Sequence, residues 1–349
     1  METSLTPFRK IALLLAISII PLLYYAWLSA NPALASAAIE MAGSKDRFQA
    51  MSLFEQTSAV IGGFVYKPIH MVLAVLVIWA LWRVKSPDLM ALRWGLFFFW
   101  LGEALCAVNY LVFNEGSPFS EFLHSYGMVV GFAFIFYALF QGLDERLIHF
   151  TKKSKKCAAS DLCGKCIKAQ AVPCGIRRLI LLLLPVMLIL AMLPLAARLQ
   201  EVSYQTVIFG TLYTYKWPSL YQLSEARFAP GLAMLLLAGA WLAMFLDRRL
   251  PIPNTARVLA AAGFGALLFG TFRFTLKTMF FENLIWADYW EELTELLFVL
   301  AITAVLILFK QSLFQEVFPG ERDIHIRRIL MPGLRPITEA KTLDTTSHQ

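Results

Sequence analysis

Long apolar segments alternate with short polar ones along almost the whole chain. A helix needs about 20 apolar residues to cross the hydrocarbon core of a bilayer. The lipid offers no partners for backbone N–H and C=O groups, so such segments are expected to be helical. The pattern predicts an all-α polytopic membrane protein with about eight transmembrane helices, near residues 11–29, 62–82, 93–113, 122–142, 179–198, 229–246, 257–278 and 291–309.

Composition agrees with this interpretation. Of the 349 residues, 58% are hydrophobic and only 16% are charged, whereas about a quarter of a typical soluble domain is charged. Eight helices leave no room for a large soluble domain. The lipid bilayer is therefore the first expected partner.

The basic residues indicate the orientation of the chain. If the N-terminus is cytosolic, the cytosolic segments hold 23 of the 31 Lys and Arg residues, as the positive-inside rule requires. We therefore expect a multi-pass protein of the cytoplasmic (inner) membrane with both termini in the cytosol. The net charge of +7 follows the membrane, so no nucleic-acid partner is expected. The segments expected in the cytosol are 1–10, 83–93, 143–178, 247–257 and 310–349.

Weak internal similarity at an offset of about 160–170 residues predicts two parallel four-helix repeats. We expect one repeat in 1–149 and the other in 176–310. A Cys-rich cytosolic linker, 150–175, would join them, and a basic tail, 311–349, would follow. Residues 1–37 also resemble a cleavable signal peptide. Repetition favours retention, because the first span has a counterpart in the fifth.

The linker carries the clearest chemical motif. Its four cysteines have the spacing C-x5-C-x2-C-x7-C, and lysines surround them. Four thiolates suit tetrahedral zinc or an iron–sulfur cluster, and the lysines would favour the thiolate form. We expect a metal site, with a thiol–disulfide switch or free thiols as the alternatives. Its ligands would be Cys157, Cys163, Cys166 and Cys174.

Charged residues within the predicted spans suggest a second site. Glu103 lies near the middle of the third span, with Asn109 nearby, and Arg273 lies inside the seventh. Glu103 and Arg273 occupy equivalent positions of the two proposed repeats, so repetition predicts an ion pair between the halves. The alternative is a salt bridge that only joins the halves. Lys277 is expected to extend toward the outer surface.

Two histidines are predicted near the outer ends of their spans, His70 in the second and His124 in the fourth. Facing imidazoles can ligate a haem iron or a metal ion, so a haem b is a further candidate cofactor. The alternative is that each imidazole makes an ordinary hydrogen bond at the interface.

Acidic residues gather at the predicted outer ends of the fourth and eighth spans. Glu121, Glu291 and Glu295 would make an acidic mouth that attracts cations. A solvated helix start, favoured by the helix dipole, is the alternative interpretation.

These patterns favour a membrane redox protein that passes electrons from the cysteine site to a quinone or another membrane subunit. Two alternatives stay open. One is a transporter of ions or small solutes with a zinc-stiffened linker, and the other is a non-catalytic assembly subunit. The sequence contains no Walker loop and no Rossmann fingerprint, so it gives no support to nucleotide chemistry.

Overall fold

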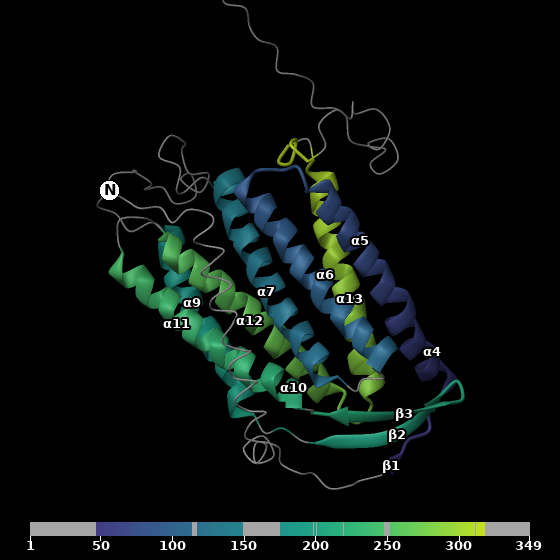
Figure 1. The fold of residues 1–349 in the computed structure, drawn as a ribbon. Coiled ribbons are helices and arrows are strands. Elements are labelled where there is room, and N and C mark those ends of the chain that lie inside the picture. Colours follow the sequence, from purple (N-terminus) through teal and green to yellow (C-terminus); the bar gives the residue numbers. More distant parts are fainter. Residues whose placement is uncertain are drawn as a thin grey trace, which may run out of the picture.

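A computed structural model shows a bundle of long helices with a small β-sheet at one end (Figure 1). We call this end of the bundle the sheet end. The structure describes residues 47–113, 117–148, 175–197, 199, 201–218, 220–247, 252–310 and 312–317. The predicted first span, the cysteine linker and most of the basic tail lie outside these residues.

Each of the seven predicted spans from 62–82 onward coincides with a long helix, although each helix begins earlier than predicted. Within the described residues, six helices are long and apolar enough to cross a membrane, which indicates a membrane protein. The seventh, α13, carries several carboxylates near its start. The helices are α4, η1 and α5 (together Leu53–Ala80), α6 (Pro87–Phe113), α7 with η2 (Pro118–Ile148), α9 (Gly175–Ala196), η3 with α11 (Ser224–Leu246), α12 (Asn254–Met279) and α13 (Leu284–Leu308).

The second span begins nine residues earlier than predicted, at Leu53. Ser52 and Glu55 form a capping box: the Ser52 side chain accepts the N–H of Glu55, and the Glu55 side chain accepts the N–H of Ser52. The helix is α-helical over α4 (Leu53–Ile61), π-helical over η1 (Gly62–Tyr66) and α-helical again over α5 (Lys67–Ala80). His70 therefore lies well inside this helix rather than at its outer end.

The same local structure occurs in the other half of the chain. The π-helical segment η3 (Ser224–Phe228) precedes α11 (Ala229–Leu246), just as η1 precedes α5. Pro68 and Pro230 follow these two segments at equivalent places, each as the second residue of its α-helix. A proline cannot donate a backbone hydrogen bond. In both halves the hydrogen-bond pattern of the helix changes in the turn before that proline, where the backbone is π-helical.

The sheet corrects the expectation of an entirely helical fold. Strands β2 (Val202–Ile208) and β3 (Thr211–Trp217) form an antiparallel hairpin, and the short β1 (Arg47–Phe48) pairs with β2 in parallel. The hydroxyl of Tyr204 in β2 accepts the N–H of Leu284, at 2.8 Å, so the sheet contacts the start of α13. Burial raises the pKa of Tyr204 above its ordinary value.

Helices α6 and α7 pack closely because glycines line their interface. A Cβ atom on Gly127 would lie 2.9 Å from Cα of Gly102, and one on Gly131 would lie 2.8 Å from N of Phe99. Small residues allow membrane helices to approach at backbone distance. This close contact fixes the position of the polar side chains that α6 and α7 direct into the bundle.

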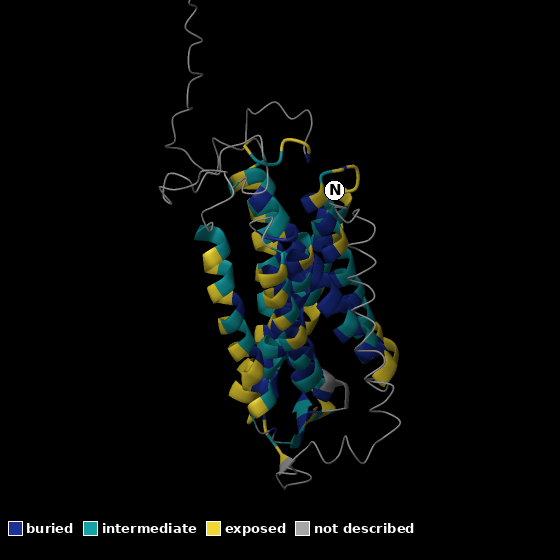
Figure 2. Cartoon of the chain, turned by 90° about the vertical axis from the view of Figure 1, so that its left-hand side faces the viewer, coloured by how far each residue is buried: buried dark blue, intermediate teal, exposed yellow. Residues whose placement is uncertain are grey.

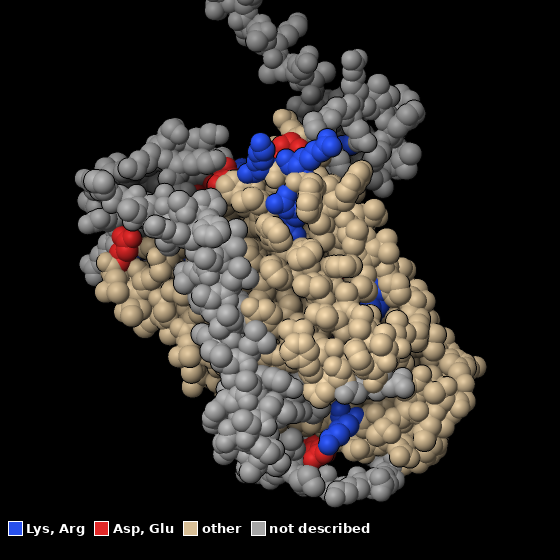
Figure 3. Space-filling model, in the orientation of Figure 1, with Lys and Arg blue, Asp and Glu red and all other residues tan. Residues whose placement is uncertain are grey.

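The surface is what a lipid-facing bundle requires. Exposed residues lie on the outer faces of the helices and buried residues lie between them (Figure 2). Large apolar side chains are among the exposed ones: Trp79 is 77% exposed and Leu182 is 67% exposed. In Figure 3 most of the coloured charged side chains lie near the two ends, and the visible surface between them is largely uncharged.

Ion pairs join the helices at the end opposite the sheet. Arg146 in η2 (Leu143–Ile148) contacts Asp88 at the start of α6, with Nε 2.5 Å from Oδ2. Arg146 also contacts Glu316, which follows α13, at 2.6 Å. Arg257 in α12 lies 3.0 Å from Asp144 in η2. These contacts connect four helices at this end of the bundle.

Candidate functional site

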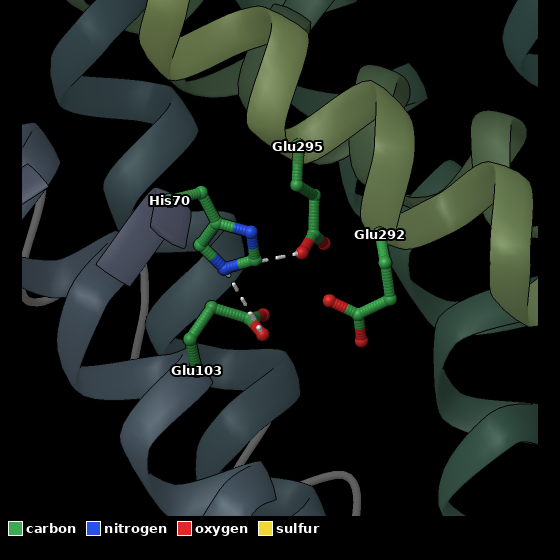
Figure 4. A group of neighbouring side chains, drawn as sticks. All are labelled: His70, Glu103, Glu292 and Glu295. Atoms are coloured by element: carbon green, nitrogen blue, oxygen red, sulfur yellow. Dashed lines mark ion pairs between the residues drawn. The ribbon is translucent and has the colours of Figure 1, made fainter. Parts of the chain in front are cut away.

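A group of ionisable side chains lies inside the bundle, between α5, α6 and α13 (Figure 4). His70 comes from α5, Glu103 from α6, and Glu292 and Glu295 from α13. His70 and Glu103 have no exposed surface, and Glu295 is 8% exposed. We call these four residues the cation site, because their chemistry suits a positively charged ligand.

The four side chains converge on a small volume. One ligand atom from each of them lies within 4.8 Å of the others. Two ligands of one ion, each bonded at about 2.0–2.2 Å, are at most about 4.4 Å apart. The site therefore needs only a slight contraction to hold one ion.

His70 is aimed at the carboxylates but is not hydrogen-bonded to them. Its Nε2 lies 3.8 Å from Oε2 of Glu103 and 3.8 Å from Oε2 of Glu295. Neither ring nitrogen has a hydrogen-bond partner, although the ring is fully buried. Buried polar atoms are nearly always satisfied, so an imidazole in this state points to a ligand.

Lys67, one turn before His70, brings a positive charge to the cation site. Its Nζ lies 2.5 Å from Oε2 of Glu103 and 2.7 Å from Oε1 of Glu292. Its side chain is only 12% exposed. With three ionised carboxylates, one ammonium and neutral imidazoles, the cation site and Lys67 have a formal charge of −2.

His124, from α7, approaches Glu103 from another direction. Its Nδ1 lies 3.0 Å from the carbonyl oxygen of Gly102 and 3.5 Å from Oε1 of Glu103. A carbonyl can only accept, so Nδ1 carries the hydrogen. Nε2 then has a free lone pair, and it is buried without a hydrogen-bond partner. The two predicted histidines thus lie on either side of one carboxylate, an arrangement that suits a small cation better than a porphyrin between the rings.

The cation site lies well inside the bundle. Glu103 is ten residues from the end of α6 at Phe113, which corresponds to ~15 Å along the helix axis. Glu292 is eight residues after the start of α13 at Leu284, or ~12 Å. Charges at such depth are costly and usually mark a pathway or a binding site.

A second group of charges lies beside the cation site and corrects the predicted pairing of Glu103 with Arg273. Arg273 instead contacts Glu225 in η3, with Nη1 2.8 Å from Oε1, and Glu291 in α13. Ser125 of α7 donates a hydrogen bond to Glu225. Glu103 takes Lys67 as its basic partner.

Consecutive carboxylates on α13 serve these two groups. Glu291 contacts Arg273 of α12, and Glu292 contacts Lys67 of α5. Helix α13 therefore connects the first half of the chain with the second through two adjacent residues.

The predicted acidic mouth has a different structure. Glu291 and Glu295 are buried in the bundle, at 7% and 8% exposure. Lys277 is paired with Asp288, and its Nζ lies 4.0 Å from Oε2 of Glu291. The start of α13 is therefore neither an open acidic mouth nor a solvated helix end, because Glu291 and Glu295 face side chains of neighbouring helices.

Asn109 and Glu121 form a separate contact near the sheet end. Nδ2 of Asn109 donates to Oε1 of Glu121 at 2.8 Å, and Oδ1 of Asn109 accepts the N–H of Ser117 at 2.9 Å. Asn109 is fully buried. These bonds join the end of α6 to the start of α7, so both residues stabilise the interface that holds Glu103 and His124.

Sequence reasoning placed His70, Glu103, His124 and Glu295 among the candidates but left out Lys67 and Glu292. A lysine within a span is by itself a sign of a functional site, and the capping box at Ser52 would have placed Lys67 inside the helix. Glu225 and Ser125 were also left out.

The predicted four-cysteine site lies outside the described residues, so its geometry is not seen. The described part of the chain contains one cysteine, Cys106 of α6, as a free thiol. Cys106 is one turn from Glu103 on the same helix.

Comparison with known proteins gives no relative. No protein-family model matches the sequence, and no curated protein or solved structure matches it significantly. The function must therefore be argued from the site itself.

Proposed function

We propose that the protein is an integral membrane transporter of a divalent metal cation, and that the cation site binds the transported ion. The observation that carries this proposal is His70, which is fully buried with both ring nitrogens unsatisfied and has its Nε2 3.8 Å from carboxylate oxygens of both Glu103 and Glu295.

Charge balance supports a divalent ion. An uncompensated formal charge of −2 inside an apolar bundle is unfavourable, because burial without a counter-charge costs many kcal/mol. One divalent cation neutralises the cation site while Lys67 keeps its proton. Uptake of two protons would also neutralise it, but an O–H of Glu103 or Glu295 would have to move closer to satisfy His70, because their oxygens lie 3.8 Å from Nε2.

The ligand set narrows the class of ion. Carboxylate oxygens suit Mg²⁺, Ca²⁺ and Mn²⁺, whereas imidazole suits zinc, iron and other transition metals. Three carboxylates with one imidazole therefore favour Mn²⁺, Fe²⁺ or Zn²⁺ over the alkaline-earth ions. Such an ion is the cargo of the transporter in this proposal.

The position of the cation site favours transport over a fixed structural role. His70 and Glu103 come from the first half of the chain, and Glu292 and Glu295 come from the second. Transporters built from repeats bind their ions deep in the membrane at the interface between repeats. The paired π-helical segments before Pro68 and Pro230 support the proposed duplication.

The basic connections support an orientation for this transporter. The helix connections at the end opposite the sheet are those rich in Lys and Arg, so we place that end in the cytosol and the sheet end outside the cytoplasmic membrane. The tightly paired Arg146 and Arg257 then lie near the cytosolic ends of the helices.

A redox function is the second candidate. Helix α7 carries Glu121-x-x-His124, and α5, α6 and α13 present His70, Glu103 and Glu292-x-x-Glu295. Four-helix proteins use carboxylates and Glu-x-x-His pairs of this kind to hold redox-active iron or manganese. The cysteine linker, with zinc or an iron–sulfur cluster, would be a separate centre. An iron-loaded, coloured preparation without transport activity would favour this function.

Transport can be tested with Mn²⁺ as the probe. The purified protein is reconstituted in liposomes, and Mn²⁺ uptake is compared between the wild type, Glu103→Gln and Glu282→Gln. Glu282 is an exposed carboxylate between α12 and α13, so it provides a matched control.

We expect uptake by the wild type and by Glu282→Gln, and loss of uptake with Glu103→Gln. Equilibrium binding of Mn²⁺ in detergent can be measured by electron paramagnetic resonance. The wild type and Glu282→Gln should bind Mn²⁺, and Glu103→Gln should bind it weakly or not at all. Wild-type protein that neither binds nor transports Mn²⁺, Fe²⁺ or Zn²⁺ would exclude the proposal.

A further inference from the structure

We infer that Lys67 is a built-in competitor for the transported cation, a role that rests on the proposed function and deepens it. In this inference the ammonium group of Lys67 binds the carboxylates of the cation site when the metal ion is absent and gives up one of them when the ion enters.

The competition follows from one shared oxygen atom. Oε2 of Glu103 lies 2.5 Å from Nζ of Lys67 and 3.8 Å from Nε2 of His70. A metal ion ligated by both Glu103 and His70 would be bonded to this oxygen at about 2.0–2.2 Å. Two positive charges cannot share one carboxylate oxygen at such distances without strong repulsion, so Lys67 must leave Glu103 when the ion binds.

Lys67 has a second anchor that allows this movement. Oε1 of Glu292 lies 2.7 Å from Nζ, and Oε2 of Glu292 is buried without a hydrogen-bond partner. The ammonium group can therefore stay paired with Glu292 while Glu103 turns to the metal. Glu295 and Cys106 also lie near Lys67, but the ion pairs of Lys67 within the described residues are with Glu103 and Glu292.

The group formed by Arg273, Glu225 and Glu291 has the same arrangement, with an arginine between two carboxylates in place of the lysine. Arg273 lies between Glu225 and Glu291, as Lys67 lies between Glu103 and Glu292. A guanidinium forms several directed bonds and holds two carboxylates firmly, whereas an ammonium on a flexible chain is an exchangeable point charge. Lys67 therefore occupies the site where the transported metal ion must bind and be released.

The competitor makes the bound ion releasable. Three carboxylates and an imidazole would bind a divalent ion tightly, and a transport site must also let its ion leave. A nearby positive charge weakens binding, and its return to Glu103 assists release. Lys67 therefore tunes affinity and turnover in opposite directions.

The test compares Mn²⁺ affinity and Mn²⁺ uptake for wild type, Lys67→Gln, Lys67→Arg and Lys277→Gln. Lys277 is a similarly buried lysine that pairs with Asp288 outside the cation site, so its variant is the matched control. A charge within about 4–6 Å changes such equilibria by roughly ten- to a thousandfold. We expect Lys67→Gln to bind Mn²⁺ at least about tenfold more tightly and to turn over more slowly in liposomes.

Lys67→Arg keeps the charge and should bind no more tightly than the wild type, which also controls for loss of the lysine side chain. Lys277→Gln should bind as the wild type does. Wild-type binding together with equal or weaker binding by Lys67→Gln would overturn this inference and leave the proposed function intact. Absence of binding by all four proteins would overturn both.

Discussion

His124 on α7 lies 3.5 Å from Glu103 on α6, measured from Nδ1 to Oε1. The contact depends on the backbone of the same two helices, because Nδ1 also donates to the carbonyl oxygen of Gly102 at 3.0 Å. Gly127 lies against Gly102 at the same level of the interface. The glycines thus bring an imidazole of one helix to a carboxylate of the other.

Replacing Gly127 with Ala should separate these helices. The new Cβ would lie 2.9 Å from Cα of Gly102 and 3.0 Å from the carbonyl oxygen of Phe98, both backbone atoms that cannot turn aside. Overpacking of this kind costs roughly 1–3 kcal/mol. We expect a lower unfolding temperature in detergent and weaker Mn²⁺ binding.

Gly231→Ala is the control for this substitution. Gly231 also lies in a membrane helix, but a Cβ there would meet no atom within 4 Å. Its unfolding temperature should be unchanged or slightly raised, because alanine loses less backbone entropy than glycine on folding. Equal behaviour of the two variants would contradict the close packing of α6 and α7.

Replacing Arg273 with Gln should destabilise the bundle without removing a metal ligand. It leaves Glu225 and Glu291 without their basic partner, and breaking a buried pair in this way costs about 3–5 kcal/mol. Adding Glu225→Gln should restore part of that stability, since one uncompensated carboxylate is then gone. Thermal unfolding of the single and double variants measures the recovery, and a double variant less stable than Arg273→Gln would argue against the pairing.

The Arg146–Glu316 contact should give a pH-dependent contribution to stability at the end opposite the sheet. Burial opposes ionisation of Glu316, but the hydrogen bond from Arg146, a backbone hydrogen bond and the charge of Arg146 together lower the pKa of Glu316 below its ordinary value of 4.5. A lowered pKa means that the contribution is present above about pH 4.5 and is lost as the pH falls through the lowered pKa.

The difference in unfolding temperature between the wild type and Glu316→Gln should therefore be small but measurable at pH 7 and should shrink below pH 4.5. The effect is small because the Glu316 side chain is 39% exposed and solvent screens such pairs. A difference that grows on acidification would contradict the assignment.

The cysteine linker predicts a metal site independent of the one in the membrane. Changing Cys163 and Cys166 to Ser should remove one zinc ion or one iron–sulfur cluster per chain from the purified protein, because a four-thiolate site fails without half of its ligands. Mn²⁺ binding at the cation site should stay unchanged. Elemental analysis of the reduced protein checks both, and unaltered metal content would exclude the cysteine ligands.

The sequence predicted the apolar helices well and their limits poorly. Hydropathy identifies a span because the lipid imposes a length and excludes polar groups. The predicted second span, 62–82, left out the first turns of the helix because residues 52–58 are mostly polar, so His70 was placed near its outer end. The helix carries Lys67 inside the bundle, where Glu103 and Glu292 compensate its charge.

The hairpin at 202–217 was available in the sequence but was not predicted. Its residues alternate in burial along β2, and β-branched and aromatic side chains dominate both strands, which is the usual signal of a strand. Two strands of seven residues give a much weaker pattern than the long apolar helices on either side of them.

The convergence of the cation site could not be predicted from the sequence alone. Glu103 and Glu292 lie in opposite halves of the chain, and their proximity depends on which helices pack together. The repeat offset that led from Glu103 to Arg273 compared equivalent positions of the two halves, and equivalent positions of a duplicated chain need not touch each other.

Two neighbouring carboxylates of helix α13 each pair with a basic side chain: Glu291 with Arg273, and Glu292 with Lys67. Successive residues of a helix point about 100° apart, so Glu291 and Glu292 face different neighbouring helices. The two ion pairs together fix the rotational setting of α13 in the bundle, since rotation about the helix axis would move both carboxylates at once.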